Sequence, residues 1–529
     1  MIRPTFYGME IAKTGLYMSQ LGMDVTAHNI ANVDTPGYTR QRVVTQSIDP
    51  YNALYRLKPL NTYKVGGGVE LKILDQIRDE FLDWQFRNEQ SNYSKWATRA
   101  QGLRYLEPLY DEFSGGGPLR VAITELFDAF DELSRNPSDR DPREITRQRA
   151  FNMIEAFQQT YTNLLAQREM QNQAVMGAAR EINKLTEQIA QLNKAINNYE
   201  YNNPMHMAND LRDKRNLLLD QLSAFIDVEY EQRDGYLNIK TAGGLTLVEG
   251  LHANIIQPVL DDDPLTGEAA TYYRLFLVDP YKVYPDFVDP NDPATFIAEM
   301  DMSNVTGGEL AGHLQLRDYA GHDNPGIPYF MERLNILAAA IVKEINAIHQ
   351  LGFTFPGSEN NVPVGPSRDG VDFFEFDITK GICDNAGNVN FKLSQDIIDS
   401  VWNIACSDEP IDLDDPETAK GGNNKIALLL ADLINSTTLD PIGNIFNFMT
   451  TVTVEVAEAI NHAGSNASAS GANLLNIDNN RTSISGVSLD EEMTNMIKYQ
   501  HSYDASARMI TTMDEMLETL INRTGVVGR

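Results

Sequence analysis

The chain has 529 residues, of which 42% are hydrophobic, and this predicts a folded protein of about three domains and excludes wholesale disorder. Its 43 basic and 74 acidic residues leave a net charge of −31, which disfavours nucleic acid and anionic membrane surfaces as partners. The two cysteines, Cys383 and Cys406, are too few for a disulfide framework or a cysteine-bound zinc site.

The N-terminal residues show no apolar segment of secretory length, because Glu10, Lys13 and Gln20 interrupt it. We therefore expect neither a signal peptide nor a membrane anchor there. The composition predicts a cytosolic protein, or one that leaves the cell by a route that needs no cleaved signal.

The first predicted element is a helix with an apolar residue at every seventh position. These residues are Met9, Leu16, Met23 and Ile30, with the small residues Ala12, Ser19 and Thr26 between them. The pattern fits a coiled-coil seam, and it fits equally an ordinary amphipathic helix on a globular core. In the stretch "NIANVDTPGYTR", Pro36 and Gly37 end the helix, and the residues from Tyr38 to Thr45 are predicted to be extended.

A second, longer helical region follows Pro142, since the next proline is Pro204 and the only glycine between them is Gly177. Fourteen positions at heptad spacing hold twelve apolar residues: Ile154, Phe157, Tyr161, Leu164, Arg168, Gln171, Val175, Ala178, Ile182, Leu185, Ile189, Leu192, Ile196 and Tyr199. A helix of about 60 residues would be about 90 Å long. We interpret this region as a rod, with a further helix after "NNPMH" that folds back on it.

From Asp227 the pattern changes to alternation of apolar and polar residues, with Asp234-Gly235 and Gly243-Gly244 as turn signals. We interpret residues 228–306 as one inserted β domain. Helix returns at "MERLNILAAAIVKEINAIHQ", residues 352–424 are mixed, and another heptad pattern runs from Phe446 to Ile460. The Gly-, Ser- and Asn-rich stretch 462–480 is predicted to be a loop.

The last predicted helix begins after Ser488, a suitable N-cap, and has Asp490 and Glu491 in its first turn. Its stripe consists of Leu489, Met493, Met496, Gln500, Tyr503, Ala507 and Ile510, and continues with Met513, Met516 and Leu520. Both ends of the chain are thus amphipathic helices without a local partner. Such helices are marginal alone and stable when paired, so each is expected to pair with the other or with another copy of the chain.

The predicted fold class is mainly α with an inserted β domain. Residues 1–60 with 485–529 are expected to form an inner domain of paired, coiled-coil-like terminal helices. Residues 61–227 with 307–484 are expected to form a helical rod domain that includes the mixed segment 352–424. Residues 228–306 are expected to form an outer, β-rich domain.

Two terminal motifs carry a family resemblance. "ANVDTPGYTRQ" near the N-terminus, together with "SGVSLDEEMTNMIKYQHSYDASARMI" near the C-terminus, resembles the axial proteins of the bacterial flagellum. Three internal segments, "NDLRDKRNLLLDQLS", "GGELAGHLQLRD" and "GGNNKIALLLADL", are similar to the family of the first hook-associated protein, the FlgK family, which joins hook to filament.

This resemblance implies a structural protein of the flagellum that leaves the cell by type III export and has neither catalytic activity nor a cofactor. The implied partners are copies of itself in a ring or helical layer, the hook protein on one side and the next hook-associated protein on the other. An export chaperone for the C-terminal helix is implied as well. The expected assembly interface consists of Met9, Leu16, Met23, Ile30, Asn32, Pro36, Gly37, Tyr38, Leu489, Met493, Met496, Tyr499, Gln500, Tyr503 and Ile510.

Other classes of protein remain alternatives: a hook-like or flagellin-like axial subunit, an adhesin, or a secreted hydrolase. A hydrolase would need a convergent acid pair or triad, and the sequence shows none. The eight histidines are scattered, without an HExxH motif. The acidic segments 261–264 and 412–422 lack the spacing and the closing Glu of a calcium loop, so solvated loops are favoured over calcium sites.

Overall fold

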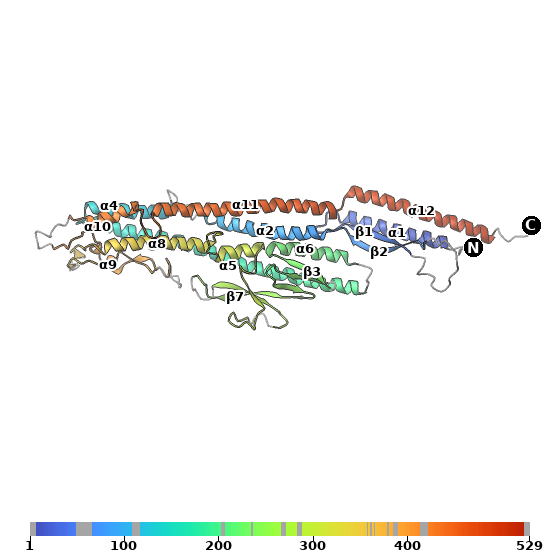
Figure 1. Cartoon of the computed structure of the whole chain (residues 1–529), viewed down its shortest axis with the longest axis horizontal. Coiled ribbons are helices and arrows are strands. Elements are labelled where there is room, and N and C mark those ends of the chain that lie inside the picture. Colours follow the sequence, from blue (N-terminus) through green and yellow to red (C-terminus); the bar gives the residue numbers. More distant parts are fainter. Residues whose placement is uncertain are drawn as a thin grey trace, which may run out of the picture. The chain divides into compact units, whose positions relative to one another are not determined.

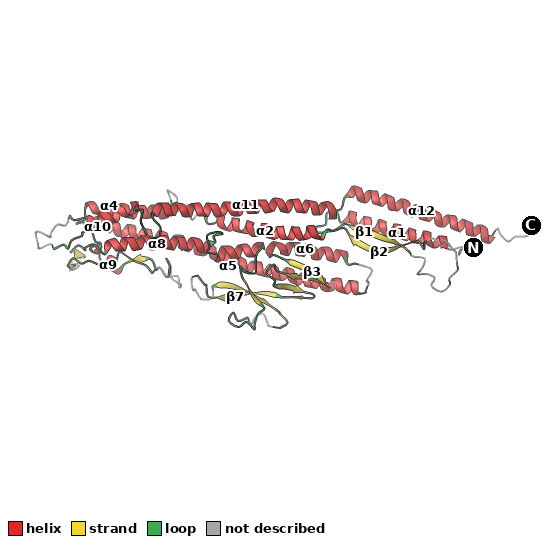
Figure 2. Ribbon diagram, in the orientation of Figure 1, coloured by secondary structure: helices red, strands yellow, loops and turns green. Residues whose placement is uncertain are grey.

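The computed structural model describes residues 7–48, 66–107, 117–202, 207–233, 236–265, 271–282, 288–356, 358–359, 362–363, 366–377, 380–383, 390–412 and 422–522. Most of them are helical (Figures 1 and 2). The chain divides into two compact units. The first contains residues 1–90, 183–254 and 471–529, and the second contains residues 91–182 and 255–470. The helices α2, α5 and α11 contribute residues to both units.

The first unit contains both terminal helices, a β-hairpin and a small sheet. Its elements are α1 (Tyr7–Ala31), β1 (Gln41–Ser47), β2 (Val69–Gln76), the start of α2 (Glu80–Arg104), the end of α5 (Arg140–Asn202), α6 (Asn209–Phe225), β3 (Glu229–Arg233), β4 (Tyr236–Lys240), β5 (Thr246–Glu249), β6 (His252–Ala253), the end of α11 (Ile445–Ser485) and α12 (Leu489–Asn522). Strands β1 and β2 pair antiparallel, and β3 to β6 form an antiparallel sheet in chain order. The expected pairing of the terminal helices and the expected end of the first helix are both confirmed.

The second unit is built on helices around one hydrophobic core. Its further elements are α4 (Pro118–Arg135), β7 (Ile255–Asp261), β8 (Tyr272–Val278), β9 (Ala298–Met300), α7 (Gly308–Asp318), α8 (Ile327–His349), β10 (Ser358–Glu359), β11 (Val362–Pro363), β12 (Phe374–Glu375), β13 (Lys392–Leu393), α9 (Gln395–Asp399) and α10 (Lys425–Asp432). Phenylalanines fill the core, and Phe130 packs edge-on against Phe373 with 5.4 Å between ring centroids.

The long helix α5 confirms the predicted rod helix. Most of its predicted stripe is buried, and the two polar members of the stripe are buried too. Arg168 donates to the carbonyl of Arg317 at 3.0 Å, and Gln171 bonds the ring of His313 at 2.8 Å. The interruption of the apolar pattern is therefore the place where the "GELAGHLQLRD" helix α7 is held against α5.

The expected single β domain over residues 228–306 is divided in the structure. Strands β3 to β6 belong to the first unit, whereas β7 to β9 form a separate antiparallel sheet in the second. The division falls at Asn254, between β6 and β7. Alternation of apolar and polar residues indicates strands, but it does not show which strands share a sheet.

The loop predicted over residues 462–480 is wrong, because α11 continues as one helix to Ser485. In the second unit, Ala463 and Ala467 of this stretch are buried. Small residues there let the helix pack closely, and this packing outweighs the low helix propensity of Gly, Ser and Asn.

One buried histidine generates a prediction. His349 of α8 is fully buried; its Nδ1–H donates to the carbonyl of Val371 at 2.6 Å, and its Nε2 accepts from the amide of Ala405 at 2.8 Å. The second bond requires a neutral ring, because a protonated Nε2 has no lone pair with which to accept. Burial, with a smaller contribution from the charge of Arg143, lowers the pKa of His349 to about 4 against the opposing effects of the Val371 carbonyl and the charge of Asp372.

Because an unfolded histidine has a pKa of about 6.5, His349 supports the folded state fully above that pH. Stability is lost as the pH falls from about 6.5 to about 4, by about 3 kcal/mol. Urea unfolding across this range should show a smaller loss for His349→Gln than for the unchanged chain, since Gln does not titrate. An equal loss in both proteins would contradict the assignment.

Candidate functional site

The two terminal helices of the first unit lie side by side and antiparallel (Figure 1). On α1 the contact face consists of small residues seven apart, and each meets a residue of α12 that is also seven from the next. The pairs are Gly8 with Met513, Gly15 with Ser506, Gly22 with Tyr499 and Asn29 with Glu492.

The helices approach each other so closely at Gly22 that a Cβ atom there would lie 2.5 Å from the Tyr499 ring. A Cβ atom added to Gly8 would lie 2.4 Å from Cε of Met513, the end of a flexible side chain that can move aside. Between these positions, Ser19 is buried and its hydroxyl donates to that of Ser502 at 3.0 Å. The Tyr499 ring can therefore pack against α1 because Gly22 has no side chain.

The predicted seam of α1 is not the centre of this contact. Met9, Leu16, Met23 and Ile30 each directly follow a contact residue, so they lie about 100° further round the helix. All four are partly exposed, whereas the glycines of the heptad face α12. The heptad at positions 8, 15, 22 and 29 is visible in the sequence, but the size of apolar residues does not indicate it as the contact face.

One set of large residues from both helices instead lies on the same side of the pair. In an antiparallel helix pair, residues displaced in the same rotational sense from the contact face lie on the same side. We call the resulting set the terminal-pair surface. It consists of Met9, Leu16, Met23, Ile30, Leu489, Met493, Met496, Gln500, Tyr503 and Ile510.

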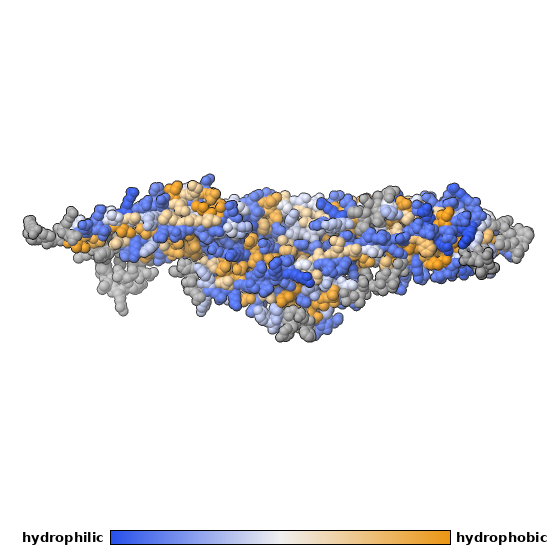
Figure 3. Space-filling model, turned by 180° about the vertical axis from the view of Figure 1, so that it is seen from behind, coloured by the Kyte–Doolittle hydropathy of each residue, from blue (hydrophilic) through white to orange (hydrophobic). Residues whose placement is uncertain are grey.

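Much of the terminal-pair surface is open to solvent. Leu489 is 46% exposed and Met493 is 58% exposed. On the face shown in Figure 3, hydrophobic patches interrupt the hydrophilic surface over α1 and α12. The structure therefore brings most of the predicted interface residues together, while Tyr499 belongs to the contact within the pair.

Asn29 fixes the place where α1 ends, and it is 1% exposed. Its Oδ1 accepts from the amide of Gln41 at 3.0 Å and from the Tyr38 hydroxyl at 2.7 Å. Its Nδ2 donates to the Gln41 carbonyl at 2.8 Å and to Glu492 Oε2 at 2.9 Å. One side chain therefore ties the end of α1 to the start of β1 and to the first turn of α12.

The turn after α1 has the geometry that its sequence predicts. Asn32 donates to the His28 carbonyl at 3.0 Å and accepts from the Thr35 hydroxyl at 3.1 Å. After the exposed Pro36, Gly37 has a φ of +77°, and a Cβ there would lie 3.1 Å from Leu217 Cβ. Glycine is therefore required both by the backbone conformation and by the approach to α6.

The "NDLRD" start of α6 lies against this turn, so two motifs that are far apart in the sequence form one site. Asp213 accepts from the amide of Thr39 at 3.0 Å and from Gln76 Nε2 at 2.8 Å. Burial raises the pKa of Asp213. Burial also raises the pKa of Tyr38, to which the charge of Asp210 adds. The Tyr38 hydroxyl also lies 2.9 Å from Nδ1 of His28, so it ties the turn back to the last turns of α1.

Arg40 was not predicted, and it joins the turn to the junction of α11 and α12. Its amide donates to the Ser485 carbonyl at 2.9 Å, and its Nε lies 2.8 Å from Glu492. The Glu492 side chain is only 3% exposed, so its charge depends on Arg40 and on Asn29 for compensation. The only sequence signal for Arg40 was its place directly after the Pro-Gly turn.

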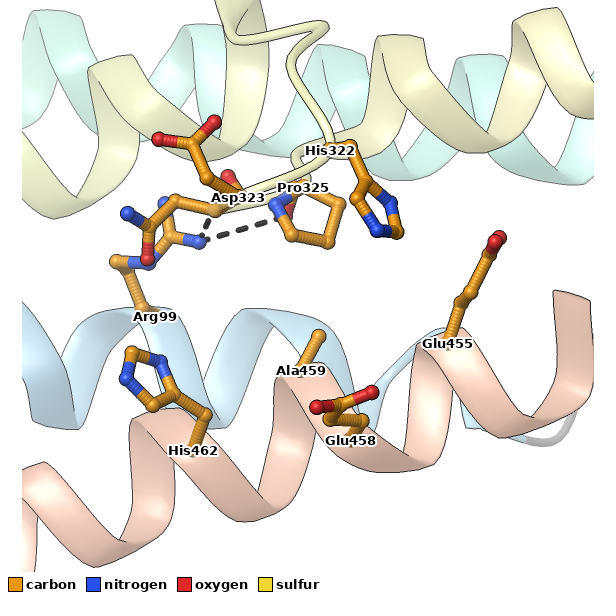
Figure 4. Close-up of a pocket in the computed structure, with 9 residues that line it drawn as sticks. Arg99, His322, Asp323, Pro325, Glu455, Glu458, Ala459 and His462 are labelled. Atoms are coloured by element: carbon orange, nitrogen blue, oxygen red, sulfur yellow. Dashed lines mark hydrogen bonds between the residues drawn. The ribbon is translucent and has the colours of Figure 1, made fainter.

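A separate pocket lies in the second unit, between residues 322–325 and α11 (Figure 4). Arg99 is buried there and donates to the carbonyls of Asn324 at 3.1 Å and Pro325 at 3.4 Å. Burial lowers its pKa to about 10. Glu455, also in this pocket, pairs with Arg333. These charged groups are engaged in holding the fold, and the pocket carries no nucleophile activated by a base.

Within the described part of the chain, no group of three or more His, Cys, Asp or Glu residues is arranged to hold a metal ion. The acidic segment 412–422 lies mostly outside the described residues. None of the described helices combines the length and the apolar character needed to cross a bilayer.

Family models match three parts of the chain. The flagellar hook-associated protein FlgK helical domain matches residues 103–362. The flagella basal body rod protein model matches residues 9–39, and the flagellar basal body rod FlgEFG protein C-terminal model matches residues 479–523. The last two cover α1 with its turn and α12, the parts that form the terminal pair.

Known proteins resemble the chain over nearly its whole length. Flagellar hook-associated protein 1 of Bacillus subtilis (strain 168) is 30% identical over 540 residues, covering 99% of each chain. The chain belongs to the flagellar hook-associated protein 1 family. Flagellar hook-associated protein 1 of Escherichia coli (strain K12) is 22% identical over 572 residues, covering 97% of this chain and 98% of that protein.

A solved structure shows the same fold. The flagellar hook junction protein FlgK from Burkholderia pseudomallei aligns with a TM-score of 0.57 at 14% identity, covering 76% of this chain and all of that one. As a member of the hook-associated protein 1 family the chain is a structural component of the flagellum and not an enzyme. The family predicted from the terminal and internal motifs is confirmed.

The contact between the terminal helices gives the first mutational prediction for this site. Gly22→Ala places a methyl group 2.5 Å from the Tyr499 ring, so we expect it to weaken the pairing by about 1–3 kcal/mol despite the better helix propensity of alanine. Hydrogen exchange of the α12 amides measures the effect. Gly177→Ala is the matched control, because nothing lies within 4 Å of a Cβ on that helical glycine. Unchanged protection of α12 in Gly22→Ala would contradict the close contact.

Proposed function

We propose that the chain joins the hook to the filament and assembles with copies of itself through the terminal-pair surface. The hook protein would bind on one side and the next hook-associated protein on the other. The observation that carries the proposal is that both ends of the chain combine into one partly exposed apolar surface. The relatives named flagellar hook-associated protein 1 support the junction role.

The terminal-pair surface has the properties of an interface. Burial of its exposed apolar side chains would contribute roughly 25 cal/mol for each Å² removed from water. Methionines such as Met493 and Met496 have flexible side chains that adapt to slightly different neighbours. A methionine-rich surface is therefore suited to a layer in which neighbouring copies do not all meet in the same way.

The turn anchored by Asn29 supports the proposal in a second way. A subunit that sits on one protein and receives a different one must use two non-identical faces, which is a heterologous contact. The bonds of Asn29, Gly37 and Arg40 fix how the chain leaves the paired helices. They would thereby set the direction in which the remainder of the subunit extends from the inner layer.

Other exposed apolar residues of α12 bear on export. Met509, Met516 and Leu520 near the end of α12 are each more than half exposed, and exposed apolar residues of this size favour aggregation before assembly. An export chaperone that covers the C-terminal helix would prevent this. We infer that the chain leaves the cell by type III export and takes its place outside the cell on the flagellum.

The turn gives a first test of this function. Gly37→Val forces a β-branched residue into the left-handed region against Leu217, which costs about 1–2 kcal/mol or more. We expect normal secretion of this variant but failure to cap hooks in a strain that lacks the chain, as seen by electron microscopy. Gly244→Val is the matched control, since Gly244 has a φ of +85° but nothing within 4 Å of its Cβ. Wild-type motility with Gly37→Val would contradict a role of this turn in assembly.

Met493→Asp tests the terminal-pair surface. In the single chain the carboxylate stays in water and costs less than about 0.5 kcal/mol. In the assembled layer it would be buried without a partner, which costs about 2 kcal/mol or more. We expect at least about tenfold fewer hooks that carry filaments. The control is Met170→Asp, at a methionine with a similar exposure of 54% in the second unit. Equal numbers of filaments from both variants would exclude this surface from the assembly contact.

A further inference from the structure

A groove of about 360 Å³ in the first unit has no role in the contacts described so far. It lies between α1, β2, the end of α5 and the start of α6. Its lining includes Asp24, Val25, Tyr199, Met207, Asn209 and Asp210. We call it the acidic groove.

The acidic groove combines an apolar wall with an acidic rim. Val25 is buried at its base, while Tyr199 is 48% exposed and Met207 is 37% exposed. The Asp210 side chain is 63% exposed, and Asp24 is exposed too. An exposed aromatic ring beside two carboxylates is the setting in which a cationic side chain gains both charge pairing and contact with a ring face.

A buried acceptor faces the same groove. Asn209 is only 4% exposed, and its Nδ2 donates to Gln41 at 3.2 Å and to the Leu74 carbonyl at 3.1 Å. Its Oδ1 has no hydrogen-bond partner in the described structure. A buried acceptor without a donor costs about 1–3 kcal/mol.

These observations define the chemistry of the occupant as a peptide with a basic side chain next to apolar ones. The chain contains such a segment. Residues 49–65 read "DPYNALYRLKPLNTYKV", with three basic residues against one acidic residue in a chain of net charge −31. The tetrapeptide Tyr55-Arg56-Leu57-Lys58 alternates apolar and basic residues. The charges of Arg56 and Lys58 are opposite to those of Asp24 and Asp210.

We propose that Tyr55–Lys58 of a second copy of the chain binds in the acidic groove. This inference rests on the proposed function, because neighbouring copies meet in the assembled layer. It adds to that function a specific contact between copies, made by a basic segment of one subunit and an acidic groove of the next.

The positions of the segment's ends favour a second copy over the same chain. Ile48 donates to the Gly68 carbonyl at 3.0 Å, and a Cβ on Gly68 would lie 3.5 Å from Ile11 Cα, so both ends lie beside the first half of α1. The groove begins at Asp24, thirteen residues further along that helix, about 20 Å away. Eight residues from Ile48 to Arg56 reach about 26 Å when fully extended. The same chain would therefore need a largely extended segment to reach its own groove.

A binding measurement tests the groove without requiring assembly. A synthetic peptide of residues 49–65 is titrated into the purified full-length chain and followed by calorimetry. We expect saturable binding that weakens as salt is raised, and at least tenfold weaker binding to Asp210→Lys. Asp128→Lys is the control, an exposed acid of α4 in the second unit, and it should bind like the unchanged chain.

Absence of saturable binding, or equal binding by Asp210→Lys and the unchanged chain, would overturn the groove assignment. Neither result would bear on the junction role, which is tested on hook tips with Gly37→Val and Met493→Asp. Circular dichroism of Asp210→Lys confirms that the variant is folded, as its exposure leads us to expect.

Disulfide trapping distinguishes the two sources of the segment. With Cys383 replaced by Ser, chains carrying Tyr199→Cys are mixed with chains carrying Leu57→Cys and oxidised. A disulfide-linked dimer that contains one chain of each kind supports the proposal. If a chain that carries both cysteines instead closes on itself and the mixture yields no dimer, the segment belongs to its own groove and the second-copy assignment is wrong.

Discussion

The close antiparallel contact between α1 and α12 is the constraint on which the rest of the first unit depends. It is possible only because α1 carries Gly8, Gly15 and Gly22 where larger residues would collide with α12. At the fourth heptad position Asn29 replaces glycine and closes the contact with hydrogen bonds instead of close packing. The glycine positions of the heptad therefore set the distance between the helices, and the hydrogen bonds of Asn29 at its end set their register.

This arrangement separates two tasks that a conventional coiled coil combines. In a conventional seam the large apolar residues are buried between the helices. Here small residues hold the helices together, and one set of large residues remains on one side of the pair. The terminal-pair surface is thus available to neighbouring subunits, because the glycines of α1 form the contact between α1 and α12. A single chain can be folded and still retain apolar area to bury on assembly.

The sequence was sufficient for the features that depend on long, regular patterns. The helix α5, the pairing of the ends and the turn at Gly37 follow from apolar period, proline placement and glycine. The contact face of α1 could not be chosen by apolar size, because a helix shows the same stripe whether that stripe faces its partner or its neighbours. The helical course of residues 462–480 was missed because burial of Ala463 and Ala467 against distant parts of the chain outweighs local propensity. Arg40 and Asp213 gain their partners only through the fold, since the partners named above are at least 137 residues away in sequence.

Net charge places a further condition on any assembly of this chain. Copies with a net charge of −31 repel one another, and at physiological salt this repulsion is screened only beyond about 8 Å. Contact between copies must therefore come from short-range interactions at places where like charges do not meet. None of the ten residues of the terminal-pair surface is charged, and the acidic groove faces a segment of opposite sign. The surfaces assigned to assembly are thus the ones at which this acidic chain can approach its own copies.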